Sequence, residues 1–156
     1  MAPEELAALP ALPEAVAEWE DLLVRLEIMP RALQGALEEP HAGGERTEAT
    51  LSALLTREVR VGRWLEEAAF GSAEATEGTW PAGMDDRWLA DRFAAVRARN
   101  FAMVQRRGVD VWNWSGQLDG TPVTVYQLLS GLVRADAAVL GALRRPGQAA
   151  SGVGAC

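Results

Sequence analysis

Three polar residues fall on positions that helical periodicity predicts to face inward. Glu58, Asn100 and Asp136 each lie within an apolar stripe of a different helical segment. A carboxyl group removed from water binds its proton more tightly, so its pKa rises toward the range that suits general acid or base catalysis. We therefore predict that Asp136 and Glu58 are catalytic residues and that Asn100 binds and orients the substrate.

A structural role for the two acids is the alternative interpretation. An uncompensated buried carboxylate destabilises a fold, whereas buried carboxylates that pair with arginine are common. Three arginines lie at nearby helical positions, namely Arg57, Arg97 and Arg134. If these arginines pair with the acids, the polar residues support the fold and take no part in proton transfer.

Aromatic side chains supply the second candidate feature, since the chain contains six tryptophans. Trp64 lies beside the main apolar stripe of its helix. Trp112 and Trp114 precede the last helix, which carries Tyr126 in its first turns. Large rings near one end of a helical domain can line a pocket for an apolar or aromatic ligand. These four residues are therefore predicted to bind the substrate.

The tryptophans also allow two other interpretations. Trp80 and Trp88 lie in or next to a second loop, and both Trp-bearing loops are expected to close the same end of the fold. The rings would then plug that end or form a dimer surface.

Four long segments have the 3.6-residue periodicity that positions these side chains. We expect helices over residues 12–39, 47–70, 85–107 and 122–145. Pro30 is expected to kink the first helix or to begin a second piece, because proline lacks the N–H that a helix interior requires. Four amphipathic helices in one domain predict an all-α four-helix bundle.

The segments outside these helices define the domain organisation. Residues 109–121 alternate briefly and contain turn residues, which predicts a loop or a short hairpin rich in tryptophan between the third and fourth helices. We assign residues 1–11 to an N-terminal extension, residues 12–146 to the bundle and residues 147–156 to a flexible tail.

The order of these parts resembles that of a known family. The stretch LSALLTRE at 51–58, an arginine-bearing third helix, and GTPVTVYQLL at 120–129 leading into VRADAAVL at 133–140 carry the resemblance. They are similar to the DinB-like family of metal-binding bundles, which includes thiol-dependent transferases that use mycothiol or bacillithiol. The resemblance covers about residues 12–146 and implies an up-down-down-up or similar topology.

The chain departs from that family at the metal ligands. In the family, one histidine of the second helix and two histidines of the fourth helix bind a divalent metal. The corresponding positions here are Leu54 (or Ala53 in the neighbouring register), Ala135 and Val139. Aliphatic side chains donate no lone pair, so we predict no metal and no other cofactor. His41 lies in a loop and is predicted to be a surface residue.

Composition limits the classes of partner. The chain has 156 residues and a net charge of -7, which disfavours binding to nucleic acid or to anionic membranes. No apolar run has the length of a membrane span. The single cysteine, Cys156, excludes a disulfide framework within one chain. We expect a cytoplasmic protein.

Charge is distributed unevenly along the chain. Residues 1–40 contain nine acids and two arginines, whereas residues 87–107 contain six arginines and one acid. The acidic first helix and the basic third helix can attract each other within the bundle or across a homodimer interface, or the arginines can simply face solvent. From these charges and the excess of tryptophan we predict a homodimer.

These observations lead to one predicted function and two alternatives. The first is a metal-independent DinB-like protein of secondary metabolism that binds a small organic molecule, either as a carrier or as an acid/base isomerase, cyclase or lyase. The first alternative is a non-catalytic dimeric bundle that serves as an interaction scaffold. The second alternative is a thiol-dependent transferase that works without the usual metal.

Overall fold

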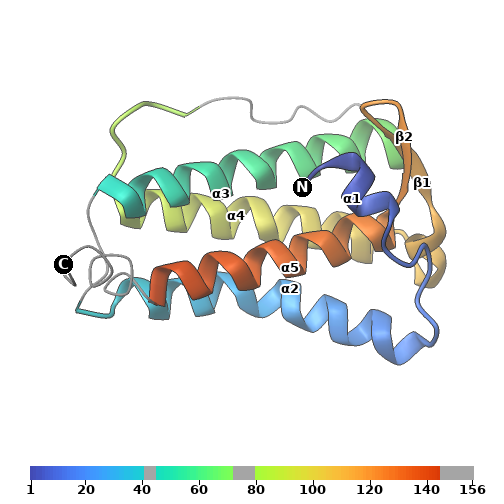
Figure 1. The fold of residues 1–156 in the computed structure, drawn as a ribbon, viewed down its shortest axis with the longest axis horizontal. Helices are drawn as coiled ribbons and strands as arrows, with labels where there is room; N and C mark the ends of the chain where they lie inside the picture. Colours follow the sequence, from blue (N-terminus) through green and yellow to red (C-terminus); the bar gives the residue numbers. More distant parts are fainter. Residues whose placement is uncertain (41–44, 72–79, 145–156) are drawn as a thin grey trace, which may run out of the picture.

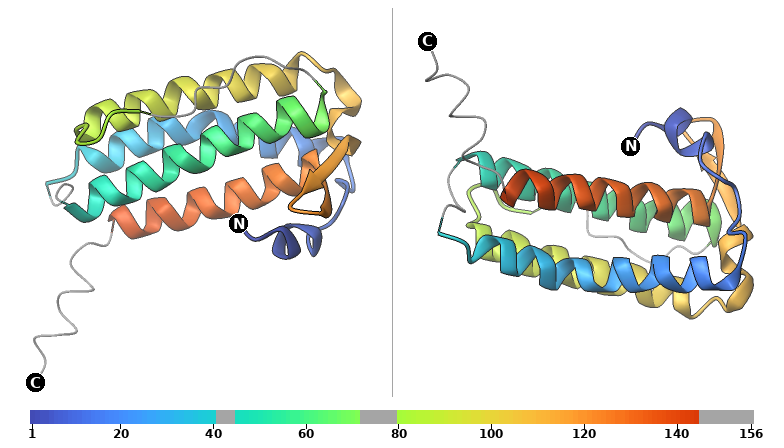
Figure 2. Two further views of the ribbon diagram at one scale, coloured as in Figure 1. Left: turned by 90° about the horizontal axis from the view of Figure 1, so that it is seen from above. Right: turned by 60° about the horizontal axis from the view of Figure 1, so that its bottom comes forward.

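Four long helices lie side by side in the computed structural model, which describes residues 1–40, 45–71 and 80–144 (Figure 1). The helices are α2 (Val16–Leu37), α3 (Glu45–Trp64), α4 (Asp86–Gln105) and α5 (Val125–Arg144). The prediction of a mainly helical fold is confirmed. Helices α2 and α5 run in one direction and α3 and α4 in the opposite direction. Figure 2 shows α3 and α5 in one layer and α2 and α4 in the other.

The first residues of the chain form a short helix, α1 (Pro3–Ala7), that packs on α5. Leu6 is buried against Gly131, where a Cβ would lie 2.1 Å from the Leu6 Cδ2 atom. The Gln127 side chain donates hydrogen bonds to the carbonyl oxygens of Ala7 at 3.3 Å and Leu9 at 2.9 Å. The N-terminal segment is therefore part of the packed domain.

Helix α2 begins at Val16 and continues without interruption through Pro30 to Leu37. Of the two alternatives predicted for Pro30, the one in which it begins a second helical piece is wrong. Proline donates no hydrogen bond to the carbonyl four residues earlier, which here belongs to Leu26. That oxygen instead accepts a hydrogen bond from Arg97 Nη1 at 3.1 Å. A side chain from α4 thus replaces the donor that Pro30 lacks.

The helix predicted over residues 47–70 consists of α3 and a π-helical turn, η1 (Leu65–Ala69). The N–H of Phe70 donates to the Leu65 carbonyl five residues earlier, at 2.9 Å. Glu66 is buried in this turn and pairs with Arg99. The π turn allows the chain to keep helical hydrogen bonding up to the start of the next connection.

Helix α4 starts close to the predicted position. Asp85 caps it, since its side chain accepts a 2.8 Å hydrogen bond from the N–H of Trp88. The following connection contains a 3₁₀ turn, η2 (Val109–Asn113), and a β-hairpin made of β1 (Ser115–Leu118) and β2 (Thr121–Thr124).

The hairpin accounts for the late start of α5. Its two turn residues, Asp119 and Gly120, have φ angles of 48° and 82°, the left-handed conformation that two-residue hairpin turns favour. Strands β1 and β2 pair in an antiparallel register that joins Ser115 to Thr124. Because residues 121–124 are in β2, the last helix begins at Val125 and not at residue 122.

Two apolar clusters fill the space between the helices. The first contains Trp19 and Trp64 and includes the partly buried Trp112 and Tyr126, at the end that carries the hairpin. The second surrounds Phe93 and includes Leu54 and Val139. Trp80 and Trp88 pack on the second cluster. The expectation that both Trp-bearing loops close the same end of the fold is therefore wrong.

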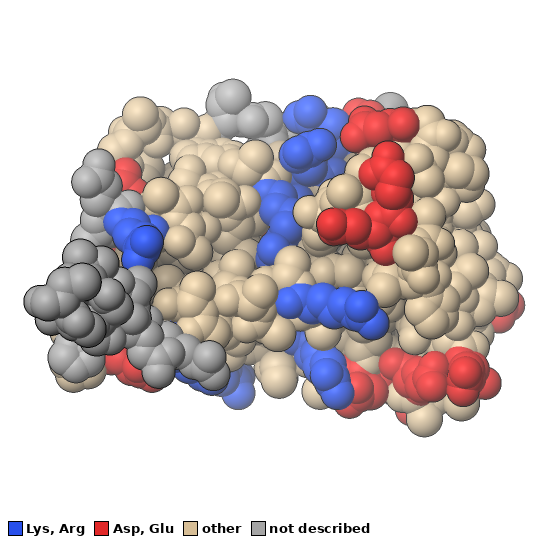
Figure 3. All heavy atoms as spheres, viewed as in Figure 1, with Lys and Arg blue, Asp and Glu red and all other residues tan. Residues whose placement is uncertain are grey.

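Charged side chains are unevenly spread over the face that carries α1, α3 and α5 (Figure 3). Basic side chains lie across the middle of this face, and acidic side chains gather toward the end that carries α1 and the hairpin. Two arginines of α3, Arg60 and Arg63, are exposed.

Candidate functional site

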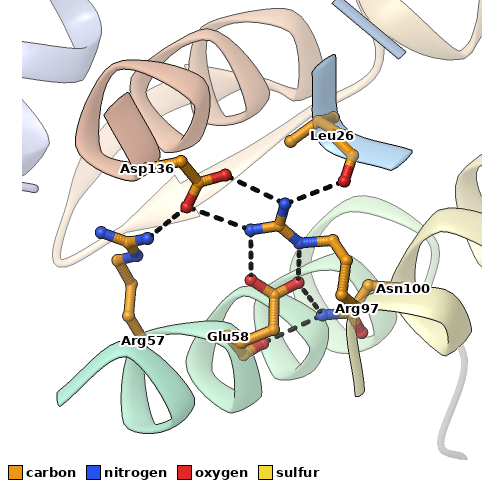
Figure 4. Close-up of polar contacts among 6 residues, drawn as sticks. All are labelled: Leu26, Arg57, Glu58, Arg97, Asn100 and Asp136. Carbon is orange, nitrogen blue, oxygen red and sulfur yellow. Dashed lines mark hydrogen bonds and ion pairs between the residues drawn. The ribbon is translucent and has the colours of Figure 1, made fainter. Parts of the chain in front are cut away.

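Glu58, Arg97 and Asp136 meet between three helices and are all buried (Figure 4). Arg97 of α4 forms a two-bond pair with Glu58 of α3, with Nε to Oε1 and Nη2 to Oε2 both at 2.9 Å. It forms a second pair with Asp136 of α5, with Nη1 to Oδ2 at 3.0 Å and Nη2 to Oδ1 at 3.2 Å. We call Glu58, Arg97, Asp136, Arg57 and Asn100 the buried polar network.

Every N–H group of the Arg97 guanidinium is used. Four of its hydrogens bond the two carboxylates, and the fifth bonds the Leu26 carbonyl of α2. A guanidinium has five N–H donors in a fixed planar arrangement. Arg97 therefore fixes the relative positions of all four long helices.

Asn100 supports Glu58 from the next turn of α4. Its Nδ2 atom donates to both the backbone carbonyl and the Oε1 atom of Glu58, each at 3.0 Å. Gly62 provides the space, because a Cβ there would lie 2.4 Å from Asn100 Oδ1. Asn100 thus binds a protein carboxylate, where the sequence predicted that it would bind a substrate.

Arg57 lies at the edge of the buried polar network and is partly exposed. Its Nη2 atom donates to Asp136 Oδ1 at 2.5 Å. Its Nε atom is buried and has no hydrogen-bond acceptor among the residues that the structure describes. Two guanidinium groups face two carboxylates, so the formal charges of the network cancel.

Burial and pairing act in opposite directions on these groups. Burial raises the pKa of Asp136 above its ordinary value, and the guanidiniums of Arg97 and Arg57 oppose this effect without cancelling it. Burial alone would lower the pKa of Arg97, but Glu58 and Asp136 outweigh it and raise that pKa. Burial lowers the pKa of Arg57 despite the nearby Asp136.

The space around Glu58 limits what this carboxylate can contact. The void that Glu58 shares with Arg97 and Asn100 measures about 10 Å³. That volume is at the limit for a single water molecule. This void therefore leaves no room for a substrate beside the Glu58 carboxylate. The pairing of both acids with arginine corresponds to the structural interpretation of the sequence, with Arg57 and Arg97 as the partners.

A larger cavity lies outside the network, on the exposed side of Arg57. It measures about 330 Å³, within the size range of small-molecule sites. Its walls come from α1, α3, the hairpin and α5. The described lining residues are Met1, Pro3, Ala53, Thr56, Arg57, Arg60, Val61, Trp64, Leu118, Asp119 and Leu128. We call this space the α3 cavity.

Of the aromatic residues predicted to bind substrate, only Trp64 is among the described residues that line the α3 cavity. Its indole N–H donates to the Gln117 carbonyl at 3.1 Å, which ties α3 to the hairpin. Trp112 and Tyr126 pack around the Trp19 ring, at centroid distances of 5.6 Å and 6.5 Å from it.

Trp114 lies elsewhere, against the end of the π turn. Its ring contacts Phe70 edge-to-face at a centroid distance of 5.4 Å. The Arg107 guanidinium lies over the Phe70 ring, 4.6 Å from its centroid. The four aromatic residues predicted to bind substrate therefore do not line one common pocket.

The α3 residues that line the cavity follow a helical pattern that the sequence analysis missed. They occupy positions i, i+3, i+4, i+7, i+8 and i+11, which share one face of the helix. The members are Ala53, Thr56, Arg57, Arg60, Val61 and Trp64. The apolar periodicity of this helix does not indicate that face, because Thr56, Arg57 and Arg60 are polar.

Two of the positions that correspond to the family's metal ligands lie in apolar surroundings, whereas Ala53 is exposed and Ala135 is partly buried outside both clusters. Leu54 is buried in the second apolar cluster, and Val139 packs against that cluster. Within residues 1–40, 45–71 and 80–144, no group of three or more potential ligands gathers in a metal-binding arrangement. His41 and Cys156 lie outside the described residues.

Comparisons with known proteins assign neither a family nor a function to this chain. No family model, curated protein sequence or solved structure matches this chain. The likeness to DinB-like proteins stays a prediction. Among the described helices, none is long and apolar enough to cross a bilayer.

Proposed function

We propose that this protein is a metal-independent, DinB-like helical bundle that binds a small organic molecule in the α3 cavity. The observation that carries the proposal is the combination of size and lining. A cavity of about 330 Å³ has apolar walls at Val61, Trp64 and Leu128 and cationic groups at Arg57 and Arg60. Ligand sites typically combine mostly apolar walls with a few polar groups that orient the ligand.

The buried polar network has a supporting role in this proposal. Asp136 holds the Arg57 guanidinium through a 2.5 Å contact, and Arg97 in turn holds Asp136. Arg57 is thereby positioned in the cavity wall. Asp136 and Glu58 are positioning residues for binding. An acid/base reaction remains a proposal in which the Arg57 side chain moves aside and Asp136 exchanges a proton directly with the ligand.

Filling the cavity tests the binding proposal. We expect N-phenyl-1-naphthylamine, an uncharged aromatic probe, to bind the wild-type protein with increased fluorescence and a one-to-one ratio. Ala53→Phe places a ring in the cavity wall and should weaken that binding at least about tenfold, which corresponds to about 1.4 kcal/mol. Ala137→Phe, at an exposed site of α5, is the matched control.

The binding proposal fails if the probe does not bind the wild-type protein. It also fails if Ala53→Phe and Ala137→Phe bind the probe as the wild type does. Circular dichroism of each variant checks that the helices are retained.

We further propose a homodimer formed through the outer face of α2. Val24 and Ile28 are 52% and 54% exposed on this face, and Glu20 and Arg31 lie on it at either side of them. A two-fold axis near residue 26 would bring Val24 close to Ile28 of the partner subunit. The same axis would place Glu20 opposite Arg31 of the partner subunit.

The dimer is tested by sedimentation or light scattering over a range of concentrations. We expect Ile28→Glu to produce a monomer and Leu12→Glu, an exposed site outside α2, to leave the dimer intact. A wild-type particle of 16.8 kDa at high concentration would contradict this proposal.

A further inference from the structure

The α3 cavity has a positive edge formed by Arg57 and Arg60. The two residues lie one helical turn apart and both line the cavity. Arg60 is exposed and has no hydrogen bond or ion pair within the described part of the chain. Asp119, in the hairpin turn, is the acid among the described lining residues. Two cationic groups thus face one acid at the cavity wall.

Arg57 has no carboxylate of its own among the described residues. Its carboxylate partner, Asp136, is shared with Arg97, which donates hydrogen bonds to both Asp136 oxygens. The Arg57 Nε atom is buried without an acceptor among the described residues. Burial lowers the pKa of Arg57, which means that its charged form is less favourable here than in water. A negative charge next to Arg57 would stabilise that form.

Away from the two arginines, the cavity wall includes a buried apolar surface. Trp64 is 7% exposed, and Val61 and Leu128 are also buried side chains that contribute to the wall. Because the indole N–H of Trp64 is already bound to Gln117, its ring offers apolar contact and no further donor. Such a wall favours an aromatic or aliphatic body over a hydrated ion.

We propose that the ligand of the α3 cavity is an organic anion with a single carboxylate or sulfonate head and an apolar body. The head lies at Arg57 and Arg60, and the body packs on Trp64 and Val61. This inference rests on the proposed function, because it specifies the ligand class of the same cavity. Arginine suits such a head because its planar N–H groups match the oxygens of a carboxylate.

Two probes that share an apolar body separate this inference from the proposed function. One is 1-anilinonaphthalene-8-sulfonate, and the other is N-phenyl-1-naphthylamine, which lacks the sulfonate. We expect the sulfonate to bind the wild-type protein at least about fivefold more tightly, and this preference should decrease as salt screens the charges. Ala53→Phe should weaken the binding of both probes.

Arg60→Gln is the variant that tests the head group, with Arg63→Gln as its matched control. Both arginines are exposed on α3, but Arg63 is absent from the described lining of the cavity. Arg60→Gln should weaken sulfonate binding about fivefold and leave binding of the neutral probe unchanged. Arg63→Gln should change neither affinity.

Each outcome has one interpretation. If neither probe binds, the proposed function fails together with this inference. If both probes bind with equal affinity in the wild type, the proposed function survives and the anion preference is wrong. If Arg63→Gln weakens the sulfonate as much as Arg60→Gln does, the preference comes from general surface charge and the inference is overturned. If inorganic phosphate displaces the sulfonate probe at equal concentration, the apolar body contributes nothing and the inference is also wrong.

Discussion

Pro30 and Arg97 act on the same atom, the Leu26 carbonyl oxygen. Pro30 cannot donate a helical hydrogen bond to it, and Arg97 Nη1 donates one from α4 at 3.1 Å. A buried carbonyl without a donor costs about 1–3 kcal/mol. The proline in α2 is therefore compatible with an intact helix because a residue 67 positions later in the chain supplies the missing donor.

Pro30→Ala tests this relationship. Alanine restores the backbone N–H and adopts helical geometry without strain, so we expect the free energy of unfolding to rise by about 1 kcal/mol or more. In an Arg97→Met background the Leu26 carbonyl has no other donor, and the gain from Pro30→Ala should be larger by about 1 kcal/mol. Urea denaturation of the four proteins measures this coupling. Equal gains in both backgrounds would show that Arg97 does not compensate for the proline.

Arg97→Met alone should destabilise the protein strongly. It leaves Glu58 and Asp136 buried as carboxylates without their main partner, and breaking such a pair costs about 3–5 kcal/mol. Replacing both acids as well, with Glu58→Leu and Asp136→Leu, removes the unpaired charges and should recover a large part of the loss. Denaturant titration of the single and triple variants measures whether stability is recovered. A triple variant less stable than the single variant would mean that the network contributes more than the mutual pairing of its charges.

Gly62→Ala tests the contact between α3 and α4 at Asn100. A Cβ 2.4 Å from Asn100 Oδ1 forces that side chain to move and weakens its bonds to Glu58, so we expect a loss of about 1–3 kcal/mol. Gly35→Ala is the matched control, since no atom lies within 4 Å of a Cβ there. That change should stabilise α2 by about 0.5–1 kcal/mol. Thermal unfolding of both variants distinguishes crowding at Asn100 from helix propensity.

The pH dependence of stability depends on Asp136. Its pKa in the folded protein is raised above 3.8, so the folded state binds this proton more tightly than the unfolded chain does. The contribution of this group to stability is therefore greatest below pH 3.8 and decreases as the pH rises through the folded pKa.

Comparison with Asp136→Asn isolates that contribution. The stability difference, wild type minus variant, should decrease between pH 3.8 and the folded pKa and then become constant. Equilibrium unfolding in urea at several pH values measures the difference. A difference that increases with pH would mean that Arg97 and Arg57 outweigh burial and hold the pKa of Asp136 below its ordinary value.

Local signals in the sequence were sufficient to predict where the long helices lie in the chain. The apolar spacing located α3 and α4, and Asp85 marked the first turn of α4 because an aspartate at that position caps a helix. Periodicity also placed Glu58 and Asp136 on inward faces, where the structure buries them. These features depend on residues close to each other in the chain.

The remaining features depend on contacts between distant residues. Five residues of α1 are too few for a stable isolated helix, and its Leu6 becomes buried only when α1 packs on α5 and β2. Several arginines had comparable spacing, so periodicity alone could not show that Arg97 would bind both acids. The sequence also could not predict that Arg97 donates to the Leu26 carbonyl, because no residue near Pro30 indicates that a side chain of α4 lies beside it.

The π turn at Leu65–Ala69 has a consequence for related chains. It lies against the hairpin, where a Cβ on Gly116 would come within 2.7 Å of the Ala68 carbonyl oxygen. Deletion of one residue from this turn would restore α-helical spacing and rotate Phe70 by about 100° around the helix axis, away from Trp114. Homologues with a single-residue gap in this turn should therefore also lack the aromatic pair at 70 and 114, so that the gap and the two aromatic positions change together during evolution.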